Sequence, residues 1–321
     1  MNPFTGAVLG ALVADAASLG LHWLYEPARL TQIAARGDIV FLEPDAAHYR
    51  DCKGYFAHGA KRTGDLSGYG ETCRLMLRHL AARDGAFDCA AYQGDFLRHF
   101  GPGGAYVGYV DRPTRLSLIR LMSADAHDGY PQPSGADDDQ LPALASLPAL
   151  VAAAVQRGRT REAMLAGVDD AVRVTNDNPV ARDAARVSAV LLAAVLCGGT
   201  RADAIAAALA LAPAALSADL RAALDGDALD APAAAARFGA ACHVGQGLPV
   251  MFHILGHARG YADAVRANIL AGGDSCGRSI VLGAVFGACD GVPLDWLARL
   301  APLAECADAA GHLFGPQACG V

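Results

Sequence analysis

The chain has 321 residues, of which 53% are hydrophobic and only 7% aromatic, and its formal net charge is −7. This length is enough to bury a large core, and an alanine-rich composition with few runs of Val, Ile or Thr favours helices over sheets. The negative charge and the lack of any Lys/Arg cluster argue against a nucleic-acid-binding protein.

The chain begins with an apolar stretch, residues 1–20, that has no basic leader and is interrupted by Asp15. We therefore expect neither a secretion signal nor a membrane-spanning segment, and no membrane partner. Residues 4–21 predict a helix on which small residues recur at helical spacing. Another helix can pack closely against these small residues, which are Gly6, Gly10, Ala14 and Ala17.

Two irregular regions, residues 37–55 and 101–141, flank a helical stripe predicted over residues 71–82. Beyond Pro142 the pattern is helical almost to the end, and we expect the segment from Gly245 to Pro249 to separate helices. The later predicted helices are residues 143–155, 160–174, 179–197, 201–211, 216–224, 248–258, 261–270 and 279–288. We predict one all-α domain over residues 1–321 in which the two irregular regions carry the function.

The nine cysteines are an odd set without any Cys-x-x-Cys spacing. Such a set fits reduced thiols in a cytosolic protein better than a disulfide framework or a zinc site. The sequence therefore predicts a cytoplasmic protein, and it leaves the oligomeric state open.

The first polar segment of interest, residues 64–72, lies just before the helical stripe at residue 71. Glu71 and Thr72 offer the oxygen donors that a hard cation prefers. The alternative is helix capping, in which Ser67 or Glu71 satisfies open N–H groups of the helix that follows. Spacing alone favours capping.

Two further segments are polar. Asp137, Asp138 and Asp139 are adjacent carboxylates, which repel one another and are usually either solvated or neutralised by a cation or an arginine. The segment from Thr175 to Pro179 is explained almost completely as the end of one helix and the capped start of the next.

The fourth segment is residues 271–279, Ala-Gly-Gly-Asp-Ser-Cys-Gly-Arg-Ser, followed by an apolar helical run. Two glycines permit a tight turn, and Asp274 and Ser275 follow where a helix begins. Cys276 would then lie in the first helical turn, where backbone dipoles and Arg278 lower a thiol pKa and favour a nucleophile. The general base that activates this thiol would have to come from elsewhere in the chain. The alternative is that Cys276 is a buried structural thiol. The histidines considered for this base are His22, His58, His127 and His243.

Aromatic and cationic residues near His22 and between Tyr109 and Arg115 suit a nucleotide or a sugar phosphate, by stacking and bidentate contacts. As isolated signals they are weak, because a Trp that follows an apolar helix, such as Trp23, usually belongs to the core.

The order of these segments resembles the ADP-ribosylglycohydrolase family across nearly the whole chain. The stretch from Gly6 to Asp15 is similar to that family's Gly-x-x-x-Gly-Asp-Ala helix, and residues 272–277 are similar to its Gly-Gly-Asp-Thr-Asp-Thr signature. The resemblance implies an all-α, single-domain orthogonal helical bundle. It also implies hydrolysis of an N- or O-glycosidic bond to ADP-ribose, assisted by two Mg²⁺ ions.

The family's motifs are altered in this chain. Gly70-Glu71-Thr72 stands in place of the metal motif Thr-Asp-Asp-Thr, Asn176 in place of a histidine, and Cys276-Gly277 in place of Asp-Thr. Residues 140–148 lie where the family has a substrate loop. In these features the chain resembles the branch that contains the lens J-crystallins and the related selenoproteins.

The resemblance and the chemistry of the residues together assign the candidate site. The predicted catalytic residues are Glu71, Asp138 and Cys276. The predicted substrate contacts are His22, Tyr69, Asp111, Asp137, Gln140 and Asn176. The predicted ligands of one or two Mg²⁺ ions, or of none if the motif has degenerated, are Glu71, Asp274 and Ser275, with Asp137–Asp139 as a further source of carboxylates.

Three functions remain open at this point. The first is a hydrolase of the ADP-ribosylglycohydrolase type, acting on a small-molecule or ADP-ribosylated substrate. The second is a metal-independent enzyme with Cys276 as its nucleophile, and the third is a non-catalytic nucleotide-binding or crystallin-like protein. The proposals about activity depend on Glu71 and Asp274 meeting above the first turn of the helix that follows Asp274, where they would line one polar cavity.

Overall fold

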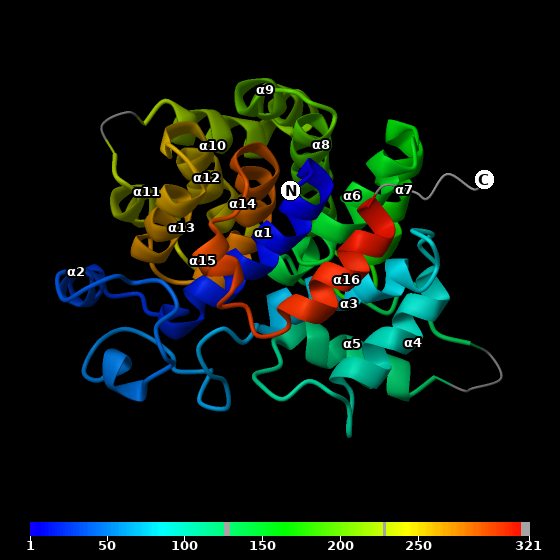
Figure 1. The fold of residues 1–321 in the computed structure, drawn as a ribbon, viewed down its shortest axis with the longest axis horizontal. Helices are drawn as coiled ribbons and strands as arrows, with labels where there is room; N and C mark the ends of the chain where they lie inside the picture. Colours follow the sequence, from blue (N-terminus) through cyan, green and yellow to red (C-terminus); the bar gives the residue numbers. More distant parts are fainter. Residues whose placement is uncertain (125–128, 227–228, 316–321) are drawn as a thin grey trace.

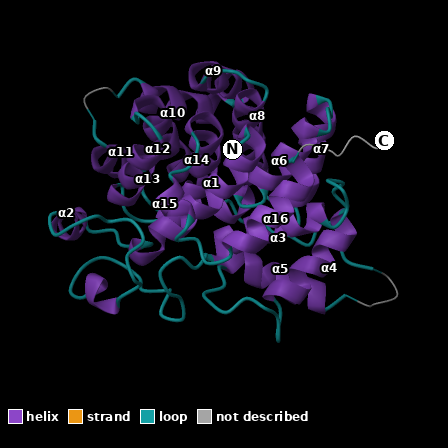
Figure 2. Ribbon diagram, viewed as in Figure 1, coloured by secondary structure: helices purple, strands orange, loops and turns teal. Residues whose placement is uncertain are grey.

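A computed structural model describes residues 1–124, 129–226 and 229–315 of the chain. Within these ranges the regular structure consists of sixteen α-helices and three short 3₁₀ helices, without a strand (Figure 2). The all-α prediction is therefore confirmed. His127, one of the histidines considered above, and Cys319 lie outside the described residues.

The helices and their order along the chain are shown in Figure 1. Their bounds are α1 Pro3–Ser18, α2 Pro27–Ala34, α3 Gly68–Ala81, α4 Cys89–Phe100, α5 Arg112–Met122, α6 Leu147–Gln156, α7 Arg161–Val172, α8 Pro179–Leu196, α9 Arg201–Leu211, α10 Ala214–Leu224, α11 Ala231–Phe238, α12 Val244–His257, α13 Tyr261–Leu270, α14 Ser275–Asp290, α15 Leu294–Leu297 and α16 Leu303–Phe314.

The centre of the fold is the antiparallel pair of α1 and α14, both buried along most of their length. A Cβ added to Gly10 would lie 2.3 Å from the carbonyl oxygen of Gly283, and one added to Gly6 equally close to that of Gly287. Only glycine permits two helix backbones to approach so closely. The small-residue face predicted on the first helix is thus confirmed, and the pairing brings the end of α1 beside the start of α14.

The segment Pro3–Leu21, which contains α1, is long and apolar enough to cross a membrane by length and composition alone. The prediction that no segment reaches this threshold was therefore wrong, because Asp15 is its single charge. Most of the segment is buried inside the protein. Asp15 itself is fully buried.

Several helix boundaries differ from the predictions. The expected loop of residues 101–141 contains α5, and α2, α4, α11, α15 and α16 were not among the predicted helices. Pro249 lies inside α12 rather than between helices. It is tolerated near the start of the helix because the carbonyl of Gly245, which loses its hydrogen bond, lies on an exposed residue.

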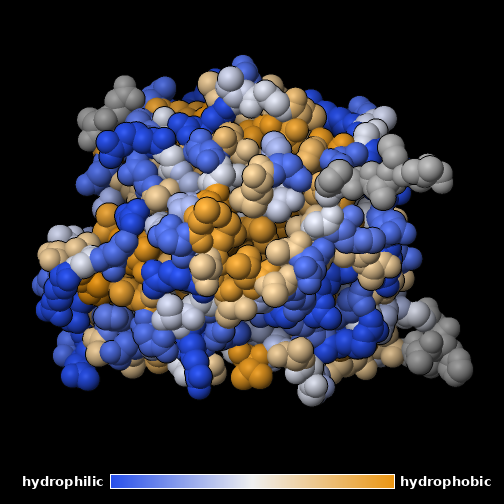
Figure 3. Space-filling model, viewed as in Figure 1, coloured by the Kyte–Doolittle hydropathy of each residue, from blue (hydrophilic) through white to orange (hydrophobic). Residues whose placement is uncertain are grey.

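The long loops gather on one side of the helical body, at the lower edge of Figure 2. The face seen in Figure 3 is largely hydrophilic, with an apolar patch over the region of α1, α14 and α15. Leu294 on α15 is the most exposed large hydrophobic residue described, at 82%.

Candidate functional site

The site is organised by the turn that leads into α14. Gly272 and Gly273 both have positive φ, 71° and 61°, which reverses the chain sharply. Asp274 then caps the helix: its Oδ1 accepts a hydrogen bond from the N–H of Gly277, 2.9 Å away. The predicted start of a helix at this segment is confirmed, although α14 begins at Ser275 rather than at residue 279.

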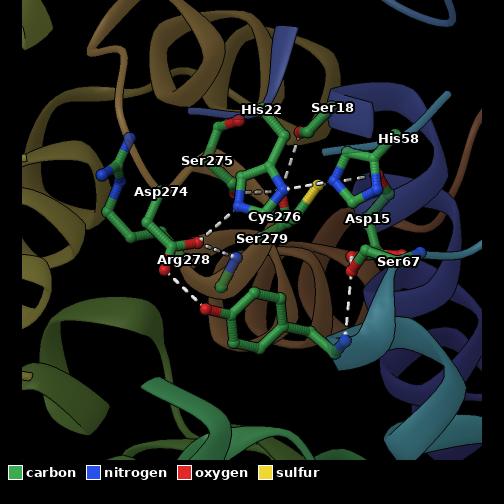
Figure 4. Close-up of polar contacts among 12 residues, drawn as sticks. Asp15, Ser18, His22, His58, Ser67, Asp274, Ser275, Cys276, Arg278 and Ser279 are labelled. Atoms are coloured by element: carbon green, nitrogen blue, oxygen red, sulfur yellow. Dashed lines mark hydrogen bonds and ion pairs between the residues drawn. The ribbon is translucent and has the colours of Figure 1, made fainter. Parts of the chain in front are cut away.

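Asp274 is completely buried and accepts hydrogen bonds on both carboxylate oxygens (Figure 4). His22 Nε2 lies 2.9 Å from Oδ1, and the hydroxyl of Tyr69 donates to Oδ2 over 2.5 Å. Burial alone would raise the pKa of Asp274. The hydrogen bond and charge of His22, together with those from Tyr69 and Gly277, outweigh burial and lower this pKa below its usual value. Asp274 is therefore a carboxylate in the folded protein.

The position of His22 is set by backbone pairing to the same turn. The N–H of Trp23 donates to the carbonyl of Gly273, and the N–H of Gly273 donates to the carbonyl of Leu24, both over 2.8 Å. Trp23 adopts φ 64°, a left-handed conformation that is strained for a bulky residue. The strained residue thus ties the end of the first helical segment to the α14 turn, and it fixes His22 beside Asp274.

His22 is bonded in turn to a second histidine. Its Nδ1 lies 2.7 Å from Nε2 of His58, which is 3% exposed (Figure 4). Burial and the neighbouring His22 and Lys61 lower the pKa of His58 to about 2, so this ring is neutral. With Asp274 ionised, Nε2 of His22 is the donor to Asp274. The direction of the bond between Nδ1 of His22 and Nε2 of His58 depends on the tautomers of the two rings. Nδ1 of His58 has no hydrogen-bond partner among the described residues.

A second buried carboxyl group, Asp15 on α1, lies beneath the start of α3. Ser67 donates to it twice, from its hydroxyl over 2.5 Å and from its backbone N–H over 2.8 Å. Burial raises the pKa of Asp15 to about 7, although the two hydrogen bonds from Ser67 oppose this shift. The capping role predicted for Ser67 is confirmed as well, because its hydroxyl accepts from the N–H of Tyr69.

Arg278 stabilises the backbone between α13 and α14 from a buried position. It is fully buried, and its guanidinium donates to the side chain of Asn268 and to the carbonyls of Asn268 and Gly272. Burial lowers the pKa of Arg278 to about 10, although the charge of Asp274 opposes this shift. The arginine therefore supports the Gly272–Gly273 turn, while its Nη1 has no hydrogen-bond partner among the described residues.

Cys276 does not have the reactive thiol that the sequence suggested. It is fully buried, and its Sγ contacts the carbonyl oxygen of Asp15 at 3.7 Å. Burial, together with the charges of Asp15 and Asp274, raises the pKa of Cys276 well above its usual value. These effects outweigh the helix dipole, so the prediction of a lowered thiol pKa was wrong, and the alternative of a structural thiol describes the residue.

Glu71 lies on the other face of α3 from Tyr69. Two residues along an α-helix turn the side chain by about 200°, so Tyr69 reaches Asp274 while Glu71 points away. Glu71 instead pairs with His99 Nε2 at 3.0 Å and with Arg74 at 3.3 Å. Burial would raise the pKa of Glu71, but the hydrogen bond from His99 and the charge of Arg74 lower it. Glu71 lines a separate surface cavity of about 380 Å³ together with Lys61 and Asp65.

Glu71 and Asp274 are bonded to different groups, Glu71 to His99 and Arg74, and Asp274 to His22, Tyr69 and Gly277. The two residues have no bonding partner in common, and the described residues contain no group of three or more His, Cys, Asp or Glu that could hold a metal ion. Among the predicted ligands, the hydroxyl of Ser275 is buried and has no hydrogen-bond partner among the described residues. Magnesium takes about six oxygen ligands. The residues present do not fit a Mg²⁺ site.

Two other carboxyl groups approach the site from the loops. Asp111 caps α5 through the N–H of Thr114, and its other oxygen faces Gly68 at the start of α3. Asp138 is 5% exposed and bonds the guanidinium of Arg112. Asp111 is close enough to Asp138 and to Asp274 for their charges to act on it. Burial and these charges raise the pKa of Asp111 to about 6, against the hydrogen bonds from Thr114.

The remaining predicted contacts lie around Asp138 in supporting positions. Asn176 is fully buried, and its Nδ2 donates to the backbone carbonyl of Asp138 over 2.9 Å. Asp137 is exposed and accepts from the side chain of Asn178, which caps α8 as predicted. Gln140 is half-buried and pairs its backbone with His243. These residues hold the loop in place, and the structure gives none of them a direct contact with Asp274.

Sequence reasoning missed the connections among His58, His22 and Asp274, and between Ser67 and Asp15. His58 lies in an irregular loop where no periodicity indicates which way a side chain points. Asp15 carried a weak signal, since a charge inside an otherwise apolar helix that becomes buried needs a hydrogen-bonding partner.

Comparison with known proteins places this geometry in a family. Residues 2–318 match the family model of the ADP-ribosylglycohydrolases. Crystallin J1A of Tripedalia cystophora is 28% identical over 320 residues, covering 91% of this chain and 90% of the crystallin. Crystallin J1B of the same organism is 29% identical over 318 residues, with the same coverage.

A solved structure described as an ADP-ribosylglycohydrolase-related protein complex has the same fold. It superposes with a TM-score of 0.67 over 98% of this chain and 97% of its own, at 19% sequence identity. The agreement of helical architecture, of the Gly-Gly-Asp turn at α14 and of the whole-length family match leads to one assignment: the chain belongs to the ADP-ribosylglycohydrolase family.

Proposed function

We propose that this protein is a hydrolase that cleaves a glycosidic bond of an ADP-ribosyl or related nucleoside or sugar substrate, using Asp111 and Asp138 rather than a metal-bound water. The observation that carries the proposal is the raised pKa of Asp111, about 6, next to a second carboxylate. Glycoside hydrolysis commonly uses such a pair, one group to protonate the leaving group and one to activate water.

The two carboxyl groups differ in the way this chemistry requires. Asp111 is partly protonated near neutral pH, which suits a general acid. Asp138 forms an ion pair with Arg112, and we assign it the role of general base. Asp274, Tyr69 and His22 form the buried layer on which Asp111 and Asp138 lie. They take no part in proton transfer.

The surroundings of Asp111 suit a nucleotide-like substrate. Trp23, Tyr55 and Tyr109 form a ring cluster, with Trp23 and Tyr109 centroids 4.8 Å apart and Tyr55 56% exposed. Exposed Arg112 supplies positive charge next to these rings. Aromatic planes and a guanidinium are the groups that stack on a base and pair with a diphosphate.

The proposal is tested by incubating the protein with N- and O-linked ADP-ribosyl compounds and measuring the release of ADP-ribose. We expect turnover that persists in excess EDTA and that falls at least about 100-fold in Asp138→Asn, the usual size of a lost acid or base. Asp308→Asn, an exposed carboxylate on α16, serves as the matched control. Turnover that EDTA abolishes, or that Asp138→Asn leaves intact, contradicts this assignment of roles.

A second candidate, a non-catalytic protein that binds nucleotides or serves as a crystallin, is favoured by the similarity to crystallins J1A and J1B. It predicts that ADP-ribose stabilises the protein against heat while no compound of the panel is hydrolysed. A Cys276 nucleophile has no such support, because that thiol is buried and its pKa is raised.

A further inference from the structure

We propose that Tyr69 and His22 occupy the positions at Asp274 that a divalent cation would take, so that Asp274 is a hydrogen-bonded anchor of the α14 turn and not a metal ligand. The inference rests on the hydrogen bonds that Asp274 accepts from Tyr69, His22 and Gly277. It does not depend on the proposed hydrolase activity, because a crystallin-like protein with the same contacts would have the same anchor.

The charge of Asp274 is satisfied by protein groups alone. A fully buried carboxylate needs hydrogen bonds or a counter-charge, since its transfer from water is costly. Asp274 accepts from the hydroxyl of Tyr69, from Nε2 of His22 and from the N–H of Gly277, and it lies at the positive end of the α14 dipole. Three of its roughly four acceptor directions are therefore used.

A cation at Asp274 would have to displace these donors and leave them buried without partners. The hydroxyl of Tyr69 belongs to a residue only 5% exposed, and His22 is 1% exposed. An unpaired buried donor is more costly than the bond it loses, because it also forfeits its contact with water. Exchange of Tyr69 for a cation is therefore opposed by the structure.

The backbone at Tyr69 is held in place, because the first turn of α3 is also bonded to Asp15 on α1. Ser67 is bonded twice to Asp15, and a Cβ at Gly70 would lie only 2.2 Å from Oδ2 of Asp15. The glycine lets α3 rest directly on that carboxyl group. A shift of the first turn of α3 that carried Tyr69 away from Asp274 would therefore break the bonds between Ser67 and Asp15 as well.

His22 is fastened in the same manner. Its backbone carbonyl accepts from the hydroxyl of Tyr49 over 2.7 Å, and its ring is bonded to His58. Each donor to Asp274 thus has a support of its own, which is the arrangement expected of a preformed anchor.

The experiment is proton NMR of the wild-type chain with Mn²⁺ as the metal probe. A 2.5 Å hydrogen bond from a tyrosine to a carboxylate gives a slowly exchanging, far-downfield proton. We expect Tyr69→Phe to delete one such signal and His22→Gln to delete a second. Tyr261→Phe is the matched control, because its buried hydroxyl donates to the neutral carbonyl of Gly10 and should leave both signals in place.

Mn²⁺ then tests the metal directly, after removal of bound ions with EDTA. We expect both downfield signals to stay unchanged at millimolar Mn²⁺, and any Mn²⁺ binding seen by EPR to persist in Asp274→Asn. Loss of the signals on adding Mn²⁺, or saturable binding that Asp274→Asn abolishes, overturns the proposal, as does a spectrum without a proton that Tyr69→Phe removes. If Asp274→Asn does not fold, the wild-type titration decides alone. Failure of the hydrolase proposal would appear only in the turnover assay.

Discussion

The first turn of α3 separates two groups of carboxyl groups that the protein treats differently. Asp15 and Asp274 are fully buried, and Ser67 and Tyr69 on this turn bond them over 2.5 Å. Asp111 and Asp138 belong to the loops, where Asp138 pairs with a largely exposed arginine. The comparison teaches that an acidic residue is an architectural anchor where buried protein donors satisfy both its oxygens, and that half-buried Asp111 is the better candidate for chemistry.

The largest effect is expected from breaking the buried group. Asp274→Ala should lower the free energy of unfolding by about 3–5 kcal/mol, because it leaves His22, Tyr69 and Gly277 with unpaired buried donors. Urea denaturation measures the change, with Asp308→Ala expected to stay within about 0.5 kcal/mol of wild type. A loss below about 1 kcal/mol for Asp274→Ala would mean that Asp274 is no anchor.

Substitution of Asp111 should change activity rather than stability. Asp111→Asn keeps the N-cap of α5, since Asn caps as well as Asp, but it removes the proton donor. We expect kcat/KM to fall about 100-fold, or about 2.7 kcal/mol, with little change in Tm.

The pH dependence sharpens this prediction. A general acid is active while protonated, so wild-type kcat/KM should decline as the pH rises through about 6, the pKa of Asp111. The residual activity of Asp111→Asn should lack that decline. A variant that keeps the same pH profile would show that another group titrates.

A smaller effect, the pH dependence of stability, distinguishes Asp15 from Asp274, the other buried carboxyl group. The pKa of Asp15 is raised from 3.8 to about 7, mainly by burial. The folded state therefore binds its proton more tightly than the unfolded state, and wild-type stability should fall as the pH rises from about 4 to about 7.

Asp15→Asn mimics the protonated carboxyl group and should not lose stability over this range. We expect the variant to gain on wild type by roughly 3 kcal/mol between these pH values, as measured by urea denaturation at each pH. A constant difference across the range would show that Asp15 does not change its protonation state there.

The smallest effect is expected at Cys276, which lies against Asp15. Cys276→Ala removes a buried sulfur that makes few polar contacts and should cost about 1 kcal/mol of stability. Turnover should stay within about twofold of wild type. In the folded protein, iodoacetamide should label the exposed Cys197 and Cys289 and spare Cys276. Loss of turnover in a fully stable Cys276→Ala variant would instead support a nucleophilic role for this thiol.

The sequence by itself determined the local features of this protein. Alanine-rich periodicity predicted the helical fold, small residues on the first helix predicted a close helix contact, and Gly272-Gly273-Asp274 predicted a turn capped into α14. Asn178 and Ser67 were correctly identified as caps. Each of these depends on a few neighbouring residues, and local propensity and hydrogen-bonding rules are enough to recognise it.

Only the tertiary structure decided which carboxyl group meets which donor. The choice of Tyr69 over Glu71 as the partner of Asp274 follows from the phase of α3, whose start lies three residues before the predicted one. The direction of the Cys276 pKa shift was also inaccessible, because burial is a property of the whole packed core while a helix dipole can be read locally. Helix caps are short-range contacts along one chain segment, whereas the side-chain donors to Asp274, His22 and Tyr69, lie more than 200 positions away along the chain.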